Sequence, residues 1–264
     1  MATDLAARFH ALHDDLVVLP NCWDAVTARL IEDAGAPALA TTSAAVAWSL
    51  GRPDGNHLER DVMLEALRRI TSAVDVPVSC DIEGGFGEGD EALAETTRLV
   101  IEAGAVGVNI EDTHAGGFRT VEDAAHRVSV VRQAADAAGV DLFINARTDS
   151  YLAGTADLDD ALVRARAYLA AGASGIFVPG TGDLDVIGRI TAAIDAPVNV
   201  LVGPGSPSVP ELRAAGVRRV SAGSSLAGAV LGHVSRAARE MLDEGTYTQM
   251  DDALGWGDVN ALFA

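Results

Sequence analysis

The sequence predicts an α/β protein, and within that class a single-domain (β/α)8 barrel of the TIM type. Eight short apolar runs alternate with longer amphipathic stretches, a pattern typical of parallel strands that are buried on both faces. The chain has 264 residues, which is a common length for eight strand–helix units in one domain. A doubly wound sheet is the alternative, but it rarely needs eight repeats, and no Gly-x-Gly-x-x-Gly motif follows the first strand.

We expect the strands, in chain order, at Leu16–Pro20, Ala38–Thr42, Val76–Asp81, Val106–Glu111, Leu142–Arg147, Gly175–Pro179, Val198–Val202 and Arg219–Ala222. Helical patterns between them include Leu58–Val74, Asp90–Ala103, Val121–Ala138 and Asp159–Ala171. A glycine that can end a helix in the left-handed conformation follows several helical stretches, at Gly35, Gly104, Gly139, Gly172 and Gly216. The barrel is expected to span residues 1–245.

The last residues, 246–264, form a separate tail in this prediction. The tail carries Tyr247, Trp256 and Phe263, which are three of the twelve Phe, Trp and Tyr residues in the chain. Aromatic side chains at the end of a chain usually need a surface to cover, so we expect the tail to pack on the barrel or on a partner subunit.

The charge balance excludes several classes of function. Asp and Glu number 38 against 19 basic residues, a formal net charge of −19, so a nucleic-acid partner is not expected. All basic residues are Arg, because the sequence contains no lysine. Without lysine there can be no Schiff base with substrate or pyridoxal phosphate, and lysine-dependent aldolases are excluded.

The cysteine count and the hydropathy pattern indicate a cytoplasmic protein. Cys22 and Cys80 are the only cysteines, and the N-terminus lacks the apolar core of a secretory signal. No run of about eighteen uncharged apolar residues is present, so we expect no membrane span and no membrane partner.

Acidic side chains gather at the expected barrel mouth, where the strands end. Asp81 and Glu83 follow the third strand, and Glu111 ends the fourth. Several carboxylates at one mouth are unstable unless they are protonated or hold a cation, and oxygen ligands favour Mg²⁺ or Mn²⁺. The alternative is that each carboxylate caps the helix that follows it. For a single acid we would favour capping, but three acids on adjacent strands favour a metal site.

Arg147 ends an otherwise apolar fifth strand. An arginine at the mouth suits bidentate binding of a carboxylate or of a developing enolate oxygen. A structural ion pair with Asp149 or Glu111 is the alternative. Thr42 and Ser43, with the backbone amides that follow them, could hold another anionic group.

Three motifs in this order carry a family resemblance: Asp81-Ile-Glu83-Gly-Gly-Phe-Gly, Asn109-Ile-Glu111-Asp112 and Asn145-Ala-Arg147-Thr-Asp149. Together with Leu19-Pro-Asn-Cys-Trp-Asp24 and Ala40-Thr-Thr-Ser43, they resemble the isocitrate lyase/phosphoenolpyruvate mutase superfamily over residues 15–235. The resemblance implies a (β/α)8 barrel whose last helix is often exchanged between subunits, so we expect a homo-oligomer, a dimer or a tetramer. It also implies Mg²⁺-dependent chemistry on 2-oxo or 2-hydroxy acids through an enolate.

The resemblance also implies roles for individual residues. Asp81 matches the principal metal-site carboxylate, Glu83 and Glu111 match acids that hold metal-bound waters, and Asp54 matches a loop acid near the metal. Three further comparisons concern the substrate. Thr42, Ser43 and Ala44 match the segment that cradles its carboxylate, and Arg147 matches the arginine beside the substrate and the bond that breaks. Asn199 falls near a polar position of the seventh strand that some lyases use.

One part of the family pattern is missing. Isocitrate and methylisocitrate lyases carry a Lys-Lys-Cys-Gly-His loop after the fourth strand, whereas this chain has the short segment 113–120 without cysteine or lysine. His114 in that segment and Cys22 after the first strand are the candidates for the missing acid–base group. The alternatives are a solvated histidine and a buried cysteine, and Cys80 is expected to face away from Asp81.

We therefore expect a Mg²⁺-dependent carbon–carbon lyase or decarboxylase acting on a small 2-oxo or 2-hydroxy dicarboxylic acid. The alternatives are phosphorus–carbon chemistry of the phosphoenolpyruvate mutase or phosphonopyruvate hydrolase kind, and a non-catalytic protein that binds a metal and an oxoacid. The substrate and the bond that breaks depend on the unfamiliar loop and do not follow from the fold.

Overall fold

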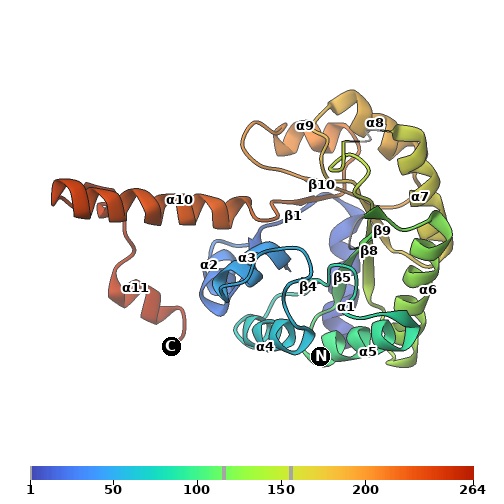
Figure 1. Ribbon diagram of the computed structural model, residues 1–264, viewed down its shortest axis with the longest axis horizontal. Coiled ribbons are helices and arrows are strands. Elements are labelled where there is room, and N and C mark those ends of the chain that lie inside the picture. Colours follow the sequence, from blue (N-terminus) through green and yellow to red (C-terminus); the bar gives the residue numbers. More distant parts are fainter. Residues whose placement is uncertain (1, 115–116, 155–156) are drawn as a thin grey trace.

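A computed structural model shows the arrangement of residues 2–114, 117–154 and 157–264 (Figure 1). The strands are β1 (Val17–Leu19), β2 (Asn21–Cys22), β3 (Leu39–Thr41), β4 (Val78–Asp81), β5 (Gly107–Glu111), β6 (Thr113–His114), β7 (Gly117–Phe118), β8 (Phe143–Arg147), β9 (Gly175–Phe177), β10 (Val198–Leu201) and β11 (Arg219–Ser221). The helices are α1 (Ala2–Ala11), α2 (Ala25–Asp33), α3 (Ser43–Ser49), α4 (Arg60–Thr71), α5 (Gly89–Glu102), α6 (Val121–Ala137), α7 (Leu158–Ala170), α8 (Leu184–Ala193), α9 (Val209–Ala214), α10 (Ser225–Arg239) and α11 (Trp256–Ala261).

Nine of these strands form one parallel sheet in the order β1-β11-β10-β9-β8-β5-β4-β3-β2. β1 and β2 are two halves of the first predicted strand and are separated only by Pro20, so the two ends of the order meet and the barrel is nearly closed. Proline has no N–H to donate to a ladder, which explains the break at this position. All eight predicted strands are present, and the predicted α/β barrel class is confirmed.

The helices that connect the strands, α2 to α9, lie around the sheet because each buries apolar residues on the side that faces it (Figure 1). Leu64, Leu67 and Ile70 of α4 are at most 1% exposed and belong to the large core between helices and strands. The five glycines predicted to end helices all have a positive φ, between +69° and +102°. The strand–helix order expected from periodicity is therefore confirmed.

Helix α1 closes the end of the barrel opposite the mouth. Phe9 of α1 meets Phe143 of β8 with ring centroids 5.4 Å apart, among buried residues from the beginnings of the strands. Gly107 makes this approach possible, because a Cβ atom there would lie 2.7 Å from the Phe9 ring. Helix α1 therefore covers the end of the barrel at which the strands begin.

The C-terminal segment leaves the barrel. Helix α10 extends away from it, and the chain then turns back through α11 (Figure 1). A π-helical turn, Glu240–Glu244, ends α10. The carbonyl of Leu262 accepts a hydrogen bond from Arg29 Nε at 2.7 Å, which ties the end of the tail to α2. The boundary at residue 245 and the role of the tail in a partner contact stay predictions.

None of the helices in the described part of the chain is both long and apolar enough to cross a bilayer.

Candidate active site

A pocket of about 190 Å³ opens at the carboxyl ends of the strands, where sites of (β/α)8 barrels lie. We call it the mouth pocket. Six of the residues that were predicted to bind substrate or metal line it: Thr42, Ser43, Ala44, Asp54, Asp81 and Arg147. An apolar wall faces them, formed by Leu152, Phe177, Pro179 and Leu201. Arg147 is the one cationic residue among the lining residues.

Asp81 ends β4 and is held by backbone groups. Its carboxylate accepts hydrogen bonds from the Ser43 N–H at 3.4 Å and from the Glu83 N–H at 3.2 Å. The side chain is 9% exposed, and the Asp81 N–H donates to Thr41 Oγ1 at 2.9 Å. Backbone N–H groups of the residues that follow β3 and β4 therefore hold this carboxylate at the mouth pocket.

Glu83 lies just behind Asp81, in a strained part of the turn that follows β4. Its φ is +49°, a left-handed value that is uncommon for a residue other than glycine. Its side-chain carboxylate accepts a hydrogen bond from the Asn56 N–H. Burial raises the pKa of Glu83 to about 7, and the negative charges of Asp81 and Asp54 add to the effect.

Glu111 ends β5 beside Arg147. One carboxylate oxygen accepts a hydrogen bond from Thr113 Oγ1 at 2.9 Å, and the other lies 3.3 Å from Arg147 Nη1. Burial raises the pKa of Glu111 to about 7 although the neighbouring guanidinium opposes it, and Asp81 also raises it. Glu83 and Glu111 thus lie close enough to Asp81 for their charges to interact, but neither lines the mouth pocket.

None of these three carboxylates caps the helix that follows it, although the Asp81 carboxylate accepts the N–H of Ser43, the first residue of α3. Helix α5 has Glu88 at its N-cap, and helix α6 has Thr120, whose hydroxyl accepts the Asp123 N–H. The capping alternative for Asp81, Glu83 and Glu111 therefore has no support in the structure. Carboxylates do cap helices elsewhere in the barrel, as Asp24 does for α2.

Arg147 has both of the ion pairs that the structural alternative required. Its guanidinium donates two hydrogen bonds to the Asp149 carboxylate, the longer at 2.9 Å, and it also pairs with Glu111. Burial lowers the pKa of Arg147, but these two carboxylates outweigh burial and hold it above the ordinary value. The side chain still lines the mouth pocket, so the pairs hold Arg147 in place without removing it from the pocket.

Sequence reasoning missed the role of Asp112, a carboxylate that is 1% exposed. It accepts hydrogen bonds from the Tyr168 hydroxyl at 2.8 Å, from Arg164 Nη1 at 3.2 Å and from the Asp149 N–H at 3.1 Å. Asp112 therefore connects α7 to the residue that holds Arg147. The sequence signal that could have indicated this role is that Asp112 directly follows Glu111, so that the two side chains point to opposite faces of the strand.

His114 and Asn199 do not line the mouth pocket. His114 is exposed in the β6–β7 hairpin, with Nδ1 3.0 Å from the Gly117 carbonyl oxygen, and it lines a neighbouring pocket with Asn56 and Arg119. Asn199 is fully buried, and its Oδ1 accepts the hydroxyl of Ser221, which does line the mouth pocket. Residues 115–116 of the segment that was predicted to supply a proton lie outside the described residues.

The two cysteines are buried and unpaired. Cys22 is 0% exposed, and burial raises its pKa to about 12, so its thiol is a poor proton donor and packs against the core. The structure thus supports the buried-cysteine alternative for Cys22. Cys80 lies in the same core, as predicted, with its pKa raised by burial.

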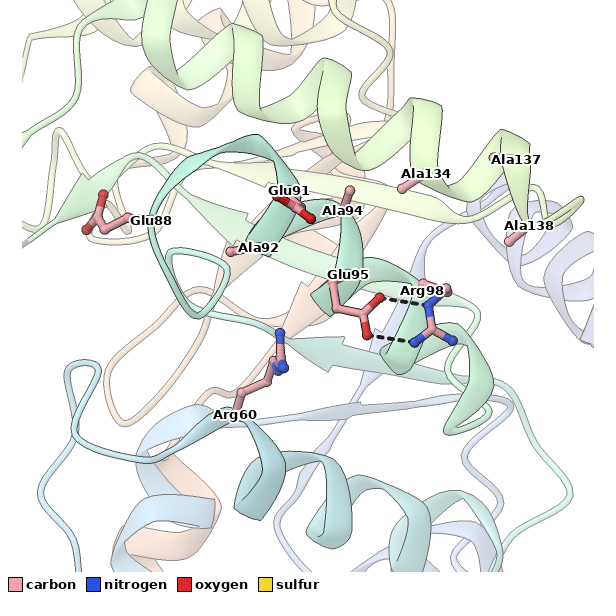
Figure 2. A pocket seen from close by; sticks show the side chains of 10 residues that line it. All are labelled: Arg60, Glu88, Glu91, Ala92, Ala94, Glu95, Arg98, Ala134, Ala137 and Ala138. Carbon is pink, nitrogen blue, oxygen red and sulfur yellow. Dashed lines mark hydrogen bonds and ion pairs between the residues drawn. The ribbon is translucent and has the colours of Figure 1, made fainter.

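A larger hollow of about 680 Å³ lies on the outer surface, between α4, α5 and α6 (Figure 2). Alanines form much of its floor, and Glu95 and Arg98 pair with one another at its rim (Figure 2). It is lined by Arg60, Glu88, Glu91 and Ala92 as well, but by none of the polar residues of the strand ends. Chemistry thus favours the smaller mouth pocket as the site.

Comparison with known proteins identifies relatives over most of the chain. The profile described as phosphoenolpyruvate phosphomutase matches residues 9–242. A Mycobacterium tuberculosis protein of uncharacterized function is 37% identical over 238 residues, which cover 89% of each chain. An oxaloacetate decarboxylase of Paraburkholderia xenovorans is 32% identical and covers 80% of this chain and 72% of its own. A 2-methylisocitrate lyase of Bacillus subtilis is also 32% identical, over 66% of this chain and 59% of its own.

Solved structures agree with these matches. A Burkholderia cenocepacia protein, provisionally assigned as a lyase/mutase, superposes with a TM-score of 0.95 at 43% identity and covers 100% of this chain and 96% of its own. The phosphoenolpyruvate phosphomutase of Streptomyces platensis superposes with a TM-score of 0.85 at 28% identity, covering 98% and 94%. The barrel fold is therefore shared with solved structures whose names describe a lyase or a mutase.

Proposed function

Because the chain belongs to the isocitrate lyase/phosphoenolpyruvate mutase superfamily, we propose that it is a Mg²⁺-dependent carbon–carbon lyase or decarboxylase. Its substrate in this proposal is a small 2-oxo or 2-hydroxy dicarboxylic acid that reacts through an enolate. One observation carries the proposal: Asp81 lines the mouth pocket with Arg147 and lies close enough to Glu83 and Glu111 for their charges to interact, and none of the three acids caps the helix that follows it. Relatives named as a lyase and as a decarboxylase support the reaction class.

The donor set fits Mg²⁺ that is held largely through water. Within the described ranges, no three Asp, Glu, His or Cys side chains converge closely enough to hold an ion directly. Mg²⁺ commonly takes one or two carboxylates and keeps several waters. Asp81 would be the direct ligand, Glu83 and Glu111 would hold waters, and Asp54 would lie nearby. A cation there would also offset the cost of burying the negative charges of Glu83 and Glu111, whose pKa values burial raises to about 7. Mn²⁺ has the same ligand preference and is the alternative metal.

When bound, Mg²⁺ supplies Lewis acidity toward the substrate carboxylate and its 2-oxygen. The chain's own residues orient the substrate. Arg147 keeps donors for a second carboxylate or for a developing oxyanion, and Asp149 and Glu111 fix its direction. Residues 42–44 line the mouth pocket, and in this proposal their backbone amides would hold a carboxylate. Asn199 would act through Ser221.

The proton donor in this proposal comes from the segment 113–120 or from water. His114 remains the candidate in that segment, and its ring lies in the pocket beside the mouth. A donor role requires the β6–β7 hairpin to move toward the mouth pocket, whereas water needs no movement. Either group suits an enolate, because protonation of such a carbanion requires only a modest acid.

Phosphorus–carbon chemistry is the second candidate. The matching profile is that of phosphoenolpyruvate phosphomutase, and an Arabidopsis thaliana relative named carboxyvinyl-carboxyphosphonate phosphorylmutase is 31% identical over 199 residues. The same metal and enolate site would serve both reactions. The short segment after β5 lacks both lysine and cysteine and does not separate the two reactions, so the relatives named as a lyase and as a decarboxylase are what favour the carbon–carbon reaction.

Proton and phosphorus NMR of one substrate pool separates these reactions. The pool contains oxaloacetate, methyl-substituted malates, isocitrate, methylisocitrate and phosphonopyruvate, with Mg²⁺ or with EDTA. We expect Mg²⁺-dependent loss of one diacid. Loss of phosphonopyruvate alone would favour the second candidate, and binding of an acid without loss would indicate a non-catalytic protein.

We further propose that the protein is a homo-oligomer, a dimer or a tetramer, built through α10. Most of the exposed large apolar side chains in the described residues lie in the last forty residues, among them Val230, Val234 and Trp256 at 48%, 57% and 84% exposure. Monomers rarely leave such a surface uncovered. The exchange of the last helix between subunits would cover it.

A cytoplasmic location completes the proposal. Both cysteines are free and buried, as is common for proteins of a reducing compartment.

A further inference from the structure

We propose that Asn109 donates a hydrogen bond from its side-chain Nδ2 to an anionic oxygen of the bound acid, and that the buried Arg219 fixes the amide in this orientation. Asn109 lies in the middle of β5, next to Asp81 of β4 in the ladder, and it lines the mouth pocket. It is 6% exposed. The inference rests on the proposed function, because it needs an acid bound at this mouth.

The orientation of the Asn109 amide follows from its partners. Its Oδ1 lies 3.2 Å from Arg219 Nη2 and 2.8 Å from Asn145 Nδ2. A guanidinium can only donate hydrogen bonds, so the amide atom that faces Arg219 has to be the oxygen. The amide nitrogen is therefore on the other side.

That nitrogen is available to a ligand. No hydrogen bond of Asn109 Nδ2 joins it to any residue in the described parts of the chain, and it is not one of the buried polar atoms that lack a partner. Since the residue lines the mouth pocket, the amide N–H groups open onto the pocket. Two N–H donors near a carboxylate or an enolate oxygen would stabilise its negative charge.

Arg219 is an unusual residue for the barrel interior. It is 1% exposed, its guanidinium lies 5.8 Å from the Phe9 ring centroid and 5.9 Å from that of Phe143, and it donates to Ser79 Oγ at 3.3 Å. Its Nε and Nη1 have no partner in the described residues. Burial lowers its pKa to about 9, so it remains charged at neutral pH.

A buried, incompletely paired guanidinium destabilises the fold, so its presence calls for a compensating role. Fixing Asn109 is such a role, because without Arg219 the two amides could turn together: Asn145 Oδ1, which has no partner among the described residues, would accept from Asn109 Nδ2, and the Asn109 oxygen would face the pocket. An acceptor there would repel an anion. Arg219 is thus a positioning residue, and it acts through Asn109.

Calorimetric titration with oxalate in the presence of Mg²⁺ tests both residues. Oxalate is a planar dianion that resembles the enolate of a 2-oxo acid. Asn109→Asp keeps an oxygen for Arg219 and Asn145 but replaces the pocket-facing donor, and Asn109→Ala removes the donor without adding charge. We expect oxalate affinity to fall about 10- to 100-fold in the alanine variant and further in the aspartate variant. Mg²⁺ affinity of Asn109→Ala without oxalate should stay within about threefold of wild type.

The Arg219 variants separate positioning from a structural role. Arg219→Met should lower oxalate affinity about tenfold, and Arg219→Lys, which can only donate, should restore it to within about threefold. A purely structural role predicts a changed melting temperature with unchanged oxalate affinity, and that result would overturn the assignment of Arg219. Wild-type affinity in both Asn109 variants would overturn the donor while leaving the proposed function intact. A wild-type protein that binds no oxalate with Mg²⁺ would contradict the proposed function and this inference together.

Discussion

Lowering the pH from 7 to 5 is expected to destabilise the barrel through one buried histidine, His13. Its ring is 4% exposed, stacks on Phe143 with centroids 3.9 Å apart, and contacts Phe9 edge-on at 4.9 Å. Burial lowers the pKa of His13 from 6.5 to about 3, and the charge of Arg219 adds to the effect. Neutral His13 fits this site, because its Nδ1 can donate to the Phe9 carbonyl oxygen at 2.8 Å.

The sign of the effect follows from proton uptake. Between pH 6.5 and 3 the unfolded chain binds a proton at His13 that the folded chain does not bind, so the stabilisation is complete above pH 6.5 and is lost as the pH falls toward 3. One such proton changes the free energy of unfolding by about 1.4 kcal/mol per pH unit. The expected loss between pH 7 and pH 5 is therefore about 2 kcal/mol.

Urea titrations of the wild type and of His13→Asn measure this loss. Asparagine can still donate to the Phe9 carbonyl but does not titrate. The carboxylates and the other histidines titrate in both proteins, so they cancel in the difference between the two free energies of unfolding. We expect that difference to change by about 2 kcal/mol over the two pH units. Parallel curves for the two proteins would refute burial of His13 as the cause.

Three further substitutions test the site and the surface. Tyr168→Phe removes a buried hydrogen bond to the Asp112 carboxylate and should lower the free energy of unfolding by about 1.5–3 kcal/mol in guanidinium titrations; a loss below about 0.5 kcal/mol would show that the bond contributes little. Arg147→Met should lower kcat/KM at least about 100-fold in the NMR assay, and Arg147→Lys should recover little because lysine cannot form the two-pronged contact with Asp149; full recovery by lysine would contradict this. Val234→Asp should dissociate the oligomer in light-scattering measurements, and an unchanged mass would place the interface elsewhere.

Much of the barrel could be predicted because its strands are marked by composition. The apolar runs are buried on both faces, and the glycines after the helices have the left-handed conformation that was expected of them. The division of the first strand at Pro20 followed from the missing N–H of proline and could have been predicted. The β6–β7 hairpin could not, since two residues per strand give no periodicity.

The mouth residues could be predicted because strand ends meet at one edge of a parallel barrel. What the sequence did not reveal is how these residues support one another. Asn109 and Arg219 looked like ordinary strand residues, and only the closure of the barrel brings the guanidinium to the asparagine across 110 positions of sequence. The available signal was the alternation of polar residues within strands, as in Asn145 and Arg147, which indicates a polar barrel interior.

The two acid–base candidates differ from the mouth residues in where the fold places them. Cys22 and His114 were chosen by residue type, which says nothing about exposure. The structure buries Cys22 in the core and places His114 in a pocket beside the mouth. Single-residue chemistry was therefore a weaker guide than a cluster of like residues on neighbouring strands.

The central claim is that Asp81 holds a divalent cation at the barrel mouth, and calorimetric titration with Mg²⁺ tests it most directly. Asp183→Asn is the matched control, because Asp183 is an acid that follows a strand but caps α8, and asparagine also caps helices. We expect one Mg²⁺ per chain in the wild type and in the control, and an affinity at least about 100-fold lower in Asp81→Asn. Equal Mg²⁺ affinity in the wild type and in Asp81→Asn would contradict the claim.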